Sequence, residues 1–304
     1  YYTLEDGQLQ IHWVHQQNAA AKTNFANWFT YHRKRENVAK NAIGTVVNQI
    51  ENGRVGFAPL NVRTHDVAID NLTTSHRSTL LDKIYSTVAY GGTPLRTRLE
   101  SIGEYYKTGD LFGVAGSSPI FSEADGGACQ SNNTILMTDG YYNGGSPSVG
   151  NVDGDHAAPY KDTWDDTLAD VAMKYFETNT AVSDGAPSAN PKMHTYTVAF
   201  GIKGSIDPDS VDINADGFSW PDPFATKAAR IDDLYHAAVN SRANYLSAQN
   251  PDALNQALAD TVNNITNMTQ SANSVASSNA RLQENDRLFI SQFSSSSWGG
   301  KLFG

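Results

Sequence analysis

An α/β fold with a doubly wound, mostly parallel sheet is predicted by three observations on this sequence. Strand-like and helix-like segments alternate along the chain, an order that places parallel strands side by side with helices on both faces. Residues 134–138 form an apolar run of the kind found in a buried parallel strand. That run ends in Thr138-Asp139-Gly140, so it delivers a carboxylate to the carboxyl edge of the sheet, where ligands bind in such folds.

The N-terminal part is expected to form a β-hairpin and then a long helix. Alternating apolar residues flank Asp6-Gly7, a dipeptide typical of a two-residue hairpin turn. From Asn24 to Ile50, apolar residues recur every three or four positions, which predicts one helix with a buried face that ends at Gly53. The pattern then predicts a strand at 55–62 with an edge or irregular position at Pro59, a helix at 78–89, and a helix that runs from Pro94 to about residue 107.

The second half continues the alternation and then changes character. Its expected elements are a strand at 134–138, a helix at 164–178, a strand at 193–200, a helix at 230–239, a short strand near Tyr245 and a helix at 251–267. Beyond Met268 the chain is rich in Ser and Asn without helical period, and apolar segments after residue 287 indicate antiparallel strands. We therefore divide the chain into a hairpin-like insertion at 1–23, an α/β domain at 24–268 and the beginning of an all-β domain at 269–304.

Composition and charge exclude several classes of protein. A chain of 304 residues with 39% hydrophobic content can bury a sizeable core. No stretch approaches the roughly 20 apolar residues that span a bilayer, so we expect no membrane span. The net charge of −10 argues against nucleic acid as a partner, and the compact basic cluster Arg33-Lys34-Arg35 is expected on the solvated face of a helix.

The single cysteine and the first residue bear on the context of this chain. Cys129 has no second cysteine to pair with, so it is either bridged to another chain or an inert buried thiol. Tyr1 is neither an initiator methionine nor the start of a signal peptide. We expect the sequence to be an internal part of a longer protein.

Thr93 and Asp139 form the first candidate metal site. Gly91-Gly92-Thr93-Pro94 is typical of a tight loop that opens a helix, with Pro94 at the first helical position and the Thr93 hydroxyl at or beside the N-cap. A hydroxyl and a carboxylate on neighbouring strand-end loops suit a hard divalent cation such as Mg²⁺ or Ca²⁺. The alternative is that Thr93 is only a helix cap and Asp139 only a turn former.

A second candidate cation site lies further along the chain. Asp212, Asn214 and Asp216, followed by Gly217, have the oxygen spacing and the glycine of a calcium loop. The match fails at the twelfth position, where Pro223 replaces the expected Glu, and a plain solvated turn is an equal alternative. Asp153-Gly154-Asp155 is a weaker candidate.

Catalytic motifs do not emerge from the sequence. There is no dinucleotide-binding glycine loop, no Walker loop and no nucleophile elbow. His236 lies in an apolar helical stretch beside Asp232 and Asp233, where a hydrogen-bonded structural histidine is the expected role. A metal-dependent hydrolase would need a positioned water and a general base that the sequence does not identify, so we expect a protein that is not an enzyme.

Five segments, in order along the chain, resemble the PilY family of type IV pilus tip adhesins and assembly factors. They are Asn24-Phe25-Ala26-Asn27-Trp28-Phe29-Thr30-Tyr31, Ile135-Leu136-Met137-Thr138-Asp139-Gly140-Tyr141-Tyr142-Asn143, Thr167-Leu168-Ala169-Asp170-Val171-Ala172-Met173, Asp232-Asp233-Leu234-Tyr235-His236-Ala237-Ala238-Val239-Asn240 and Trp298-Gly299-Gly300-Lys301-Leu302. The resemblance implies a von Willebrand factor A-like domain followed by the first strands of a β-propeller. It also implies an extracellular location at the pilus tip, with minor pilins and a host-cell or surface receptor as partners.

The resemblance also implies a metal-ion-dependent adhesion site built from three loops. Thr93 and Asp139 match the second and third loops, but no Asp-x-Ser-x-Ser of the first loop occurs in this sequence. That loop follows the central strand of the sheet, so we expect residues upstream of Tyr1 to supply both the strand and the remaining ligands. The alternative function is a metal-independent scaffold that caps the pilus fibre on minor pilins.

Overall fold

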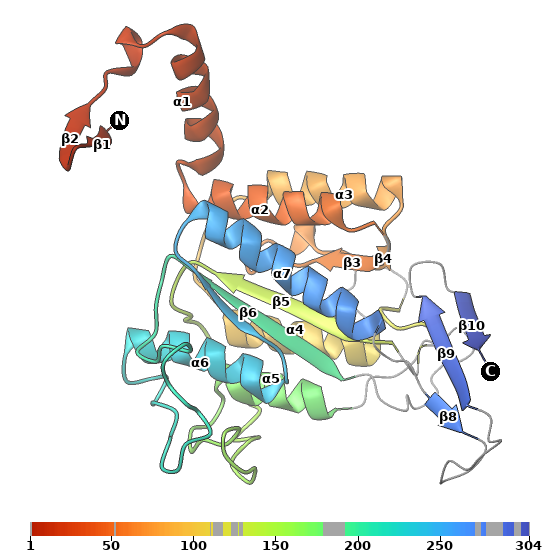
Figure 1. Ribbon diagram of the computed structural model, residues 1–304. Helices are drawn as coiled ribbons and strands as arrows, with labels where there is room; N and C mark the ends of the chain where they lie inside the picture. The colour runs from red at the N-terminus through yellow and green to blue at the C-terminus, as the bar shows by residue number, and fades with distance from the viewer. Residues whose placement is uncertain are drawn as a thin grey trace.

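The computed structural model describes residues 2–51, 53–109, 111, 118–122, 127, 130–178, 192–270, 275–277, 288–294 and 299–303. Helices cover a central parallel sheet on both faces, while the N-terminal hairpin and first helix extend away from this body (Figure 1). The expectations for Cys129 and Trp298 lie outside the described residues.

The central sheet consists of three parallel strands in the order β5-β6-β7, with Thr134 opposite Thr195 and Thr197 opposite Tyr245. The strands are β5 (Asn132–Thr138), β6 (Met193–Phe200) and β7 (Tyr245–Ala248). The helices that pack on them are α2 (Arg35–Gln49), α4 (Leu95–Thr108), α5 (Leu168–Glu177), α6 (Lys227–Asn240) and α7 (Pro251–Gln270). The α/β class and the parallel sheet predicted from the sequence are therefore confirmed.

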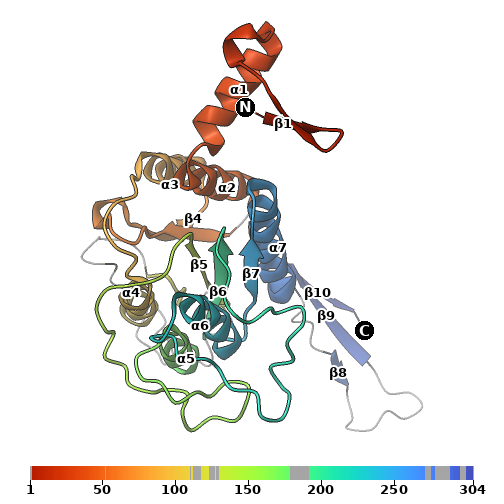
Figure 2. The ribbon, with the colours of Figure 1, turned by 90° about the vertical axis from the view of Figure 1, so that its left-hand side faces the viewer.

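The two faces of this sheet bury two separate hydrophobic clusters. Leu136 and Ala199 pack with residues of α4, α5 and α6. Val198 and Phe200 point the other way and pack with α2 and α7. Figure 2 shows the same division, with α4, α5 and α6 on one side of the strands and α2 and α7 on the other. Alternate residues of each strand thus contact opposite helix layers, as a doubly wound sheet requires.

Two further strands form a ladder of their own. β3 (Arg54–Phe57) and β4 (Val67–Asn71) pair antiparallel and pack against α3 (Thr74–Ser86), and the 3-10 turn η2 (Arg63–His65) lies between them. Gly56 allows this pairing, since a Cβ there would lie 2.9 Å from the carbonyl oxygen of Val67. Within the part of the chain that is described, β5 pairs only with β6, and β3–β4 pairs with no other strand. The expected upstream central strand remains a prediction.

The N-terminal part contains the predicted hairpin but not the single long helix. β1 (Tyr2–Glu5) and β2 (Gln8–Ile11) pair across Asp6 and Gly7, which both have positive φ as a primed hairpin turn requires. After the 3-10 turn η1 (Val14–Gln16), α1 (Ala19–His32) ends before α2 begins. The prediction of one helix was wrong because Lys34 is extended, with φ −112 and ψ 144, and acts as the N-cap of α2. The basic triplet therefore marks a helix boundary, and it does not lie on one continuous helix.

Other boundaries differ from the sequence expectations for local reasons. The strand predicted at 55–62 ends at Phe57, and the helix predicted at 78–89 begins at Thr74 because Thr73 accepts a hydrogen bond from the amide of His76. The segment after Met268, where no helical period was expected, begins with the end of α7. β8 (Val275–Ser277), β9 (Leu288–Ser294) and β10 (Gly299–Phe303) form an antiparallel sheet. Assignment of these strands to a propeller remains a prediction.

Candidate functional site

The structure places the two sequence-predicted metal ligands on adjacent loops at the carboxyl end of β5. The Thr93 hydroxyl oxygen lies 3.9 Å from the position that a Cβ on Gly140 would occupy. Asn143 joins the two loops through two hydrogen bonds of 2.9 Å. Its side-chain oxygen accepts from the backbone amide of Thr93, and its backbone amide donates to the Thr93 carbonyl oxygen. Asp139 is exposed. This arrangement agrees with the expected neighbourhood of Thr93 and Asp139.

The start of α4 and the turn after β5 show the local surroundings of Thr93 and Asp139. The N-cap of α4 is Pro94, with φ −80 and ψ 56, so Thr93 lies one residue outside the helix and the prediction that Pro94 is its first residue was wrong. The turn after β5 is closed by Thr138, whose hydroxyl oxygen contacts both the amide and the carbonyl of Gly140. The Thr93 hydroxyl therefore does not cap α4, and Thr138 supplies a side-chain contact in the turn that contains Asp139.

A positive charge lies at the same edge of the sheet. The Arg35 guanidinium donates to the Asp139 carbonyl oxygen at 3.1 Å and comes within 3.5 Å of a Cβ built on Gly201, the residue that follows β6. The sequence interpretation missed this contact because it treated residues 33–35 as part of a solvated helix face. Arg35 brings a cation to the ends of both β5 and β6.

The fit of a divalent cation to this edge follows from these contacts. Thr93 and Asp139 offer one hydroxyl and one carboxylate, which suit Mg²⁺ or Ca²⁺, but these ions take six or more oxygen ligands. The two side chains therefore form part of a coordination shell, and other groups must complete it.

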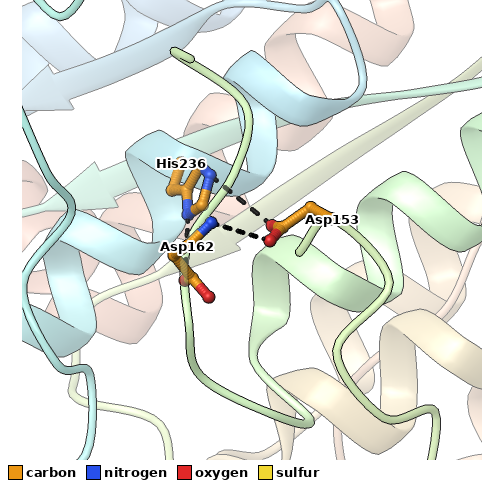
Figure 3. Close-up of side chains that lie close together, drawn as sticks. All are labelled: Asp153, Asp162 and His236. Carbon is orange, nitrogen blue, oxygen red and sulfur yellow. Dashed lines mark hydrogen bonds and ion pairs between the residues drawn. The ribbon is translucent and has the colours of Figure 1, made fainter. Parts of the chain in front are cut away.

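A second cluster is assembled from residues that lie far apart in the sequence. Asp153 and Asp162 come from the loop between β5 and α5, and His236 comes from α6; their exposed fractions are 0%, 8% and 1%. His236 Nε2 lies 3.6 Å from Asp153 Oδ2, and its Nδ1 lies 3.4 Å from Asp162 Oδ2 (Figure 3). Among the described residues this is the one group of three acidic, histidine or cysteine side chains whose ligand atoms all lie within 4.8 Å of one another.

Backbone amides hold the two carboxylates in place. The Asp162 amide donates to Asp153 Oδ1 at 2.9 Å, and the Trp164 amide donates to Asp162 Oδ1 at 2.7 Å. In each carboxylate the other oxygen, Oδ2, is therefore the one that faces His236. Burial raises the pKa of Asp153, and the nearby His236 opposes that rise.

The imidazole itself is fixed on two further sides. Trp220 stacks on it, with ring centroids 4.3 Å apart and planes 14° apart. The Tyr160 carbonyl oxygen lies 2.5 Å from Nε2. The expected structural role of His236 is thus consistent with its contacts, although Asp153 and Asp162 are its carboxylate partners where the sequence suggested Asp232 and Asp233.

Asp233 and Asp170 tie the same loop to α5. Asp233 accepts from the amides of Leu168 and Ala169, at 2.9 and 3.0 Å, and from the Tyr142 hydroxyl at 2.6 Å. Asp170 accepts from the amides of Val152 and Thr167, and burial raises its pKa to about 7. Burial likewise raises the pKa of Asp233. These carboxylates position the loop that carries Asp153 and Asp162.

The remaining candidates lie on the surface. Asp212, Asn214 and Asp216 are exposed, and the Asp212 carboxylate accepts from the Asn214 amide at 2.9 Å, as in a local turn. The calcium loop stays a prediction. Asp155 is also exposed, so of the weaker pair Asp153 and Asp155 only Asp153 belongs to the buried cluster.

Comparison with known proteins finds relatives of this chain among type IV pilus proteins. The chain is 30% identical over 324 aligned residues to "Type IV pilus biogenesis factor PilY1" of Pseudomonas aeruginosa strain PAK, and 26% identical over 345 residues to the protein of the same name in strain UCBPP-PA14. The first alignment covers 88% of this chain and the second 92%. The resemblance to the PilY family is thereby confirmed over most of the chain, which spans only 28% to 29% of the length of these relatives.

Other comparisons add less. No family model matches the chain. A solved structure of the pilus adhesin SpaC from Lactobacillus rhamnosus GG in its open conformation aligns with a TM-score of 0.43 and 13% identity, covering 86% of this chain and 34% of that one. Among the described residues, none of the helices has both the length and the apolar character needed to cross a bilayer.

Proposed function

We propose that this chain is part of a type IV pilus adhesin and assembly factor that binds surface ligands and minor pilins at the pilus tip, outside the cell, and is not an enzyme. The observation that carries this proposal is the 30% identity to a pilus biogenesis factor along 88% of the chain. The pilus association is inferred from the name of the relatives. The proposed binding surface is the edge of the sheet that carries Thr93 and Asp139.

The carboxyl edge of the sheet is the proposed ligand site because exposed groups of both polarities meet there. Asp139 projects from the end of β5 beside Thr93, and Arg35 brings a guanidinium to the same edge. In the proposed mechanism, Thr93 and Asp139 are two ligands of a Mg²⁺ or Ca²⁺ ion whose remaining ligands come from other parts of the protein and from the partner. Such an ion adds a coordination position for a carboxylate of the partner, while Arg35 holds the backbone of Asp139 in place.

Substitution of Asp139 tests this mechanism. Asp139→Ala should reduce attachment of piliated cells by at least about tenfold, because one lost charged ligand contact costs about 1.4 kcal/mol or more. Pilus display, measured by surface immunoblot, should stay unchanged. Asp82→Ala is a matched control, since Asp82 is an exposed carboxylate on α3. Attachment that is indifferent both to Asp139→Ala and to chelation of Mg²⁺ and Ca²⁺ would contradict metal-dependent binding.

An alternative function is a metal-independent scaffold that caps the fibre on minor pilins, and one observation favours it. The N-terminal hairpin and α1 expose large apolar side chains, with Ile11 57%, Trp13 61%, Trp28 51% and Phe29 42% exposed. Exposed apolar groups of this size commonly mark protein contacts. If the scaffold role holds, Trp13→Ala combined with Trp28→Ala should lower piliation, whereas Asp139→Ala should leave both piliation and attachment intact.

A further inference from the structure

We propose that Asp153, Asp162 and His236 bind a divalent transition-metal ion of the Zn²⁺ or Mn²⁺ kind, which pins the loop between β5 and α5 onto α6. This site is separate from the Thr93 and Asp139 edge and does not depend on the proposed function. Two carboxylate oxygens and one imidazole nitrogen form a mixed oxygen and nitrogen donor set. That set suits these ions better than Ca²⁺ or Mg²⁺, which prefer oxygen alone.

The distances fit a metal centre. Two ligands that each lie about 2.1 Å from a tetrahedral ion are about 3.4 Å apart. Asp162 Oδ2 and His236 Nδ1 are 3.4 Å apart, which matches this spacing, whereas the 3.6 Å approach of Asp153 Oδ2 is to Nε2 on the other side of the ring. One ligand atom from each residue lies within 4.8 Å of the other two, so the widest pair closes by up to about 1.4 Å when all three share one ion.

The hydrogen bonds around the imidazole leave one nitrogen for the metal. A carbonyl oxygen can only accept, so Nε2 carries a proton in its 2.5 Å contact with the Tyr160 carbonyl. In a neutral imidazole, Nδ1 then has the lone pair, and Nδ1 is the nitrogen that faces Asp162. Metal-binding histidines commonly donate their other ring N–H to a carbonyl in this way, which fixes the tautomer and the ring orientation.

Asn240 is an independent observation that points to a bound ion. Its side chain is 0% exposed and is directed at the cluster, with Nδ2 2.6 Å from Asp153 Oδ2. Its Oδ1 is buried and has no hydrogen-bond partner. A buried acceptor left unsatisfied costs about 1–3 kcal/mol. As placed, Nδ2 donates to Asp153 Oδ2 and lies 3.4 Å from the Ala169 carbonyl oxygen. A 180° turn of the amide would set Oδ1 against both of these acceptors, and that orientation is favourable only with a cation beside Oδ1 and Asp153 Oδ2.

The charge balance of the cluster also calls for a cation. With Nδ1 unprotonated, the two carboxylates face a neutral imidazole, and burying uncompensated charge is costly. A divalent ion neutralises both carboxylates. The competing arrangement is a doubly protonated His236 between two aspartates with no metal, and the experiment below separates the two.

The test measures bound metal in the intact protein after chelation and dialysis against Zn²⁺, Mn²⁺, Ca²⁺ or Mg²⁺. The expected result is one Zn²⁺ or Mn²⁺ per chain that Asp162→Asn and His236→Gln each remove. Asp155→Asn, an exposed neighbour in the same loop, should retain it. Co²⁺ in the wild-type protein should give visible d–d absorption that Zn²⁺ displaces, so the proposal can be tested even if a variant fails to fold.

Three outcomes would overturn the inference. Wild-type protein that retains no stoichiometric metal with any of the four ions would favour the doubly protonated histidine. If Asp162→Asn and His236→Gln both retain the metal and Asp139→Ala loses it, the metal belongs to the sheet edge. That result would support the proposed function and contradict this second site. Binding of Ca²⁺ or Mg²⁺ in preference to Zn²⁺ and Mn²⁺ would contradict the assigned class of ion.

Discussion

The exposed sheet edge and the buried cluster use similar side chains in opposite surroundings. Asp139 is exposed beside Thr93, with its backbone held by Arg35. Asp153 and His236, by contrast, are 0% and 1% exposed and have backbone or side-chain partners on several sides. A group at the edge can exchange water for a partner, whereas a buried group can only hold parts of the same chain together. Burial thus separates a carboxylate that a partner can reach from carboxylates that only other parts of the chain contact.

The largest effect is expected on the free energy of unfolding, which should differ between a buried and an exposed carboxylate. Asp233→Ala should lower the free energy of unfolding by about 4 kcal/mol, because it leaves the amides of Leu168 and Ala169 and the Tyr142 hydroxyl without their acceptor. Asp139→Ala should change it by less than about 0.5 kcal/mol, as expected for an exposed side chain. Urea unfolding followed by circular dichroism measures both. Equal losses in the two variants would show that burial does not separate the two regions.

A smaller effect on the free energy of unfolding is expected when two helix caps are removed in turn. Thr167 is buried and forms a reciprocal capping box with Asp170 at the start of α5, whereas Thr73 caps α3 at the surface. Thr167→Ala should cost about 2 kcal/mol and Thr73→Ala about 0.5–1 kcal/mol, since both lose a cap but only the first also breaks a buried network. The same urea measurement applies. A larger loss for Thr73→Ala would contradict the supporting role assigned to the α5 region.

Much of the fold could be predicted because its signals are local. β5 is an apolar run, α5 and α6 have apolar residues at helical spacing, and the structure confirms these elements with shifts of a few residues at their ends. β4 was missed because it is only five residues long and follows an irregular connection. The break at Lys34 was missed because the apolar spacing is helical on both sides of it, and the sequence interpretation assigned the polar residues 32–37 to the same helix. Trp28 and Phe29 in α1 are exposed.

The two candidate sites also differ in whether local sequence patterns could predict them. Thr93 and Asp139 could be paired from the sequence, because a strand end and a helix start are both local patterns and parallel strands bring them to one edge. Asp162 and His236 lie 74 positions apart, and their meeting depends on a loop path set by amides bound to Asp153, Asp170 and Asp233. One usable signal was the density of aspartates between β5 and α5, far above what a simple solvated connection needs. No pattern in the sequence links that density to α6.

The smallest effect is expected from the half-buried His194, in comparison with the buried His236. His236 faces two carboxylates, whereas His194 on β6 lies near Lys192 and Arg242 and donates from Nδ1 to the Ser241 carbonyl at 2.9 Å. Burial, and secondarily the two cations, lower the pKa of His194, although the Ser241 carbonyl opposes this. Below about pH 6.5 the unfolded chain therefore binds a proton that the folded chain resists, so His194 lowers stability as pH falls through that value toward its folded pKa.

Urea unfolding of wild type and His194→Gln at about pH 7.5 and about pH 5.5 isolates this contribution. Gln keeps a donor near the Ser241 carbonyl but does not titrate, so the variant should lose less stability on acidification than wild type. The difference should be smaller than the loss caused by Thr167→Ala. An identical acid response in the two proteins would mean that His194 takes up its proton as readily in the folded chain as in the unfolded one, and burial beside two cations would then not distinguish it from an exposed imidazole.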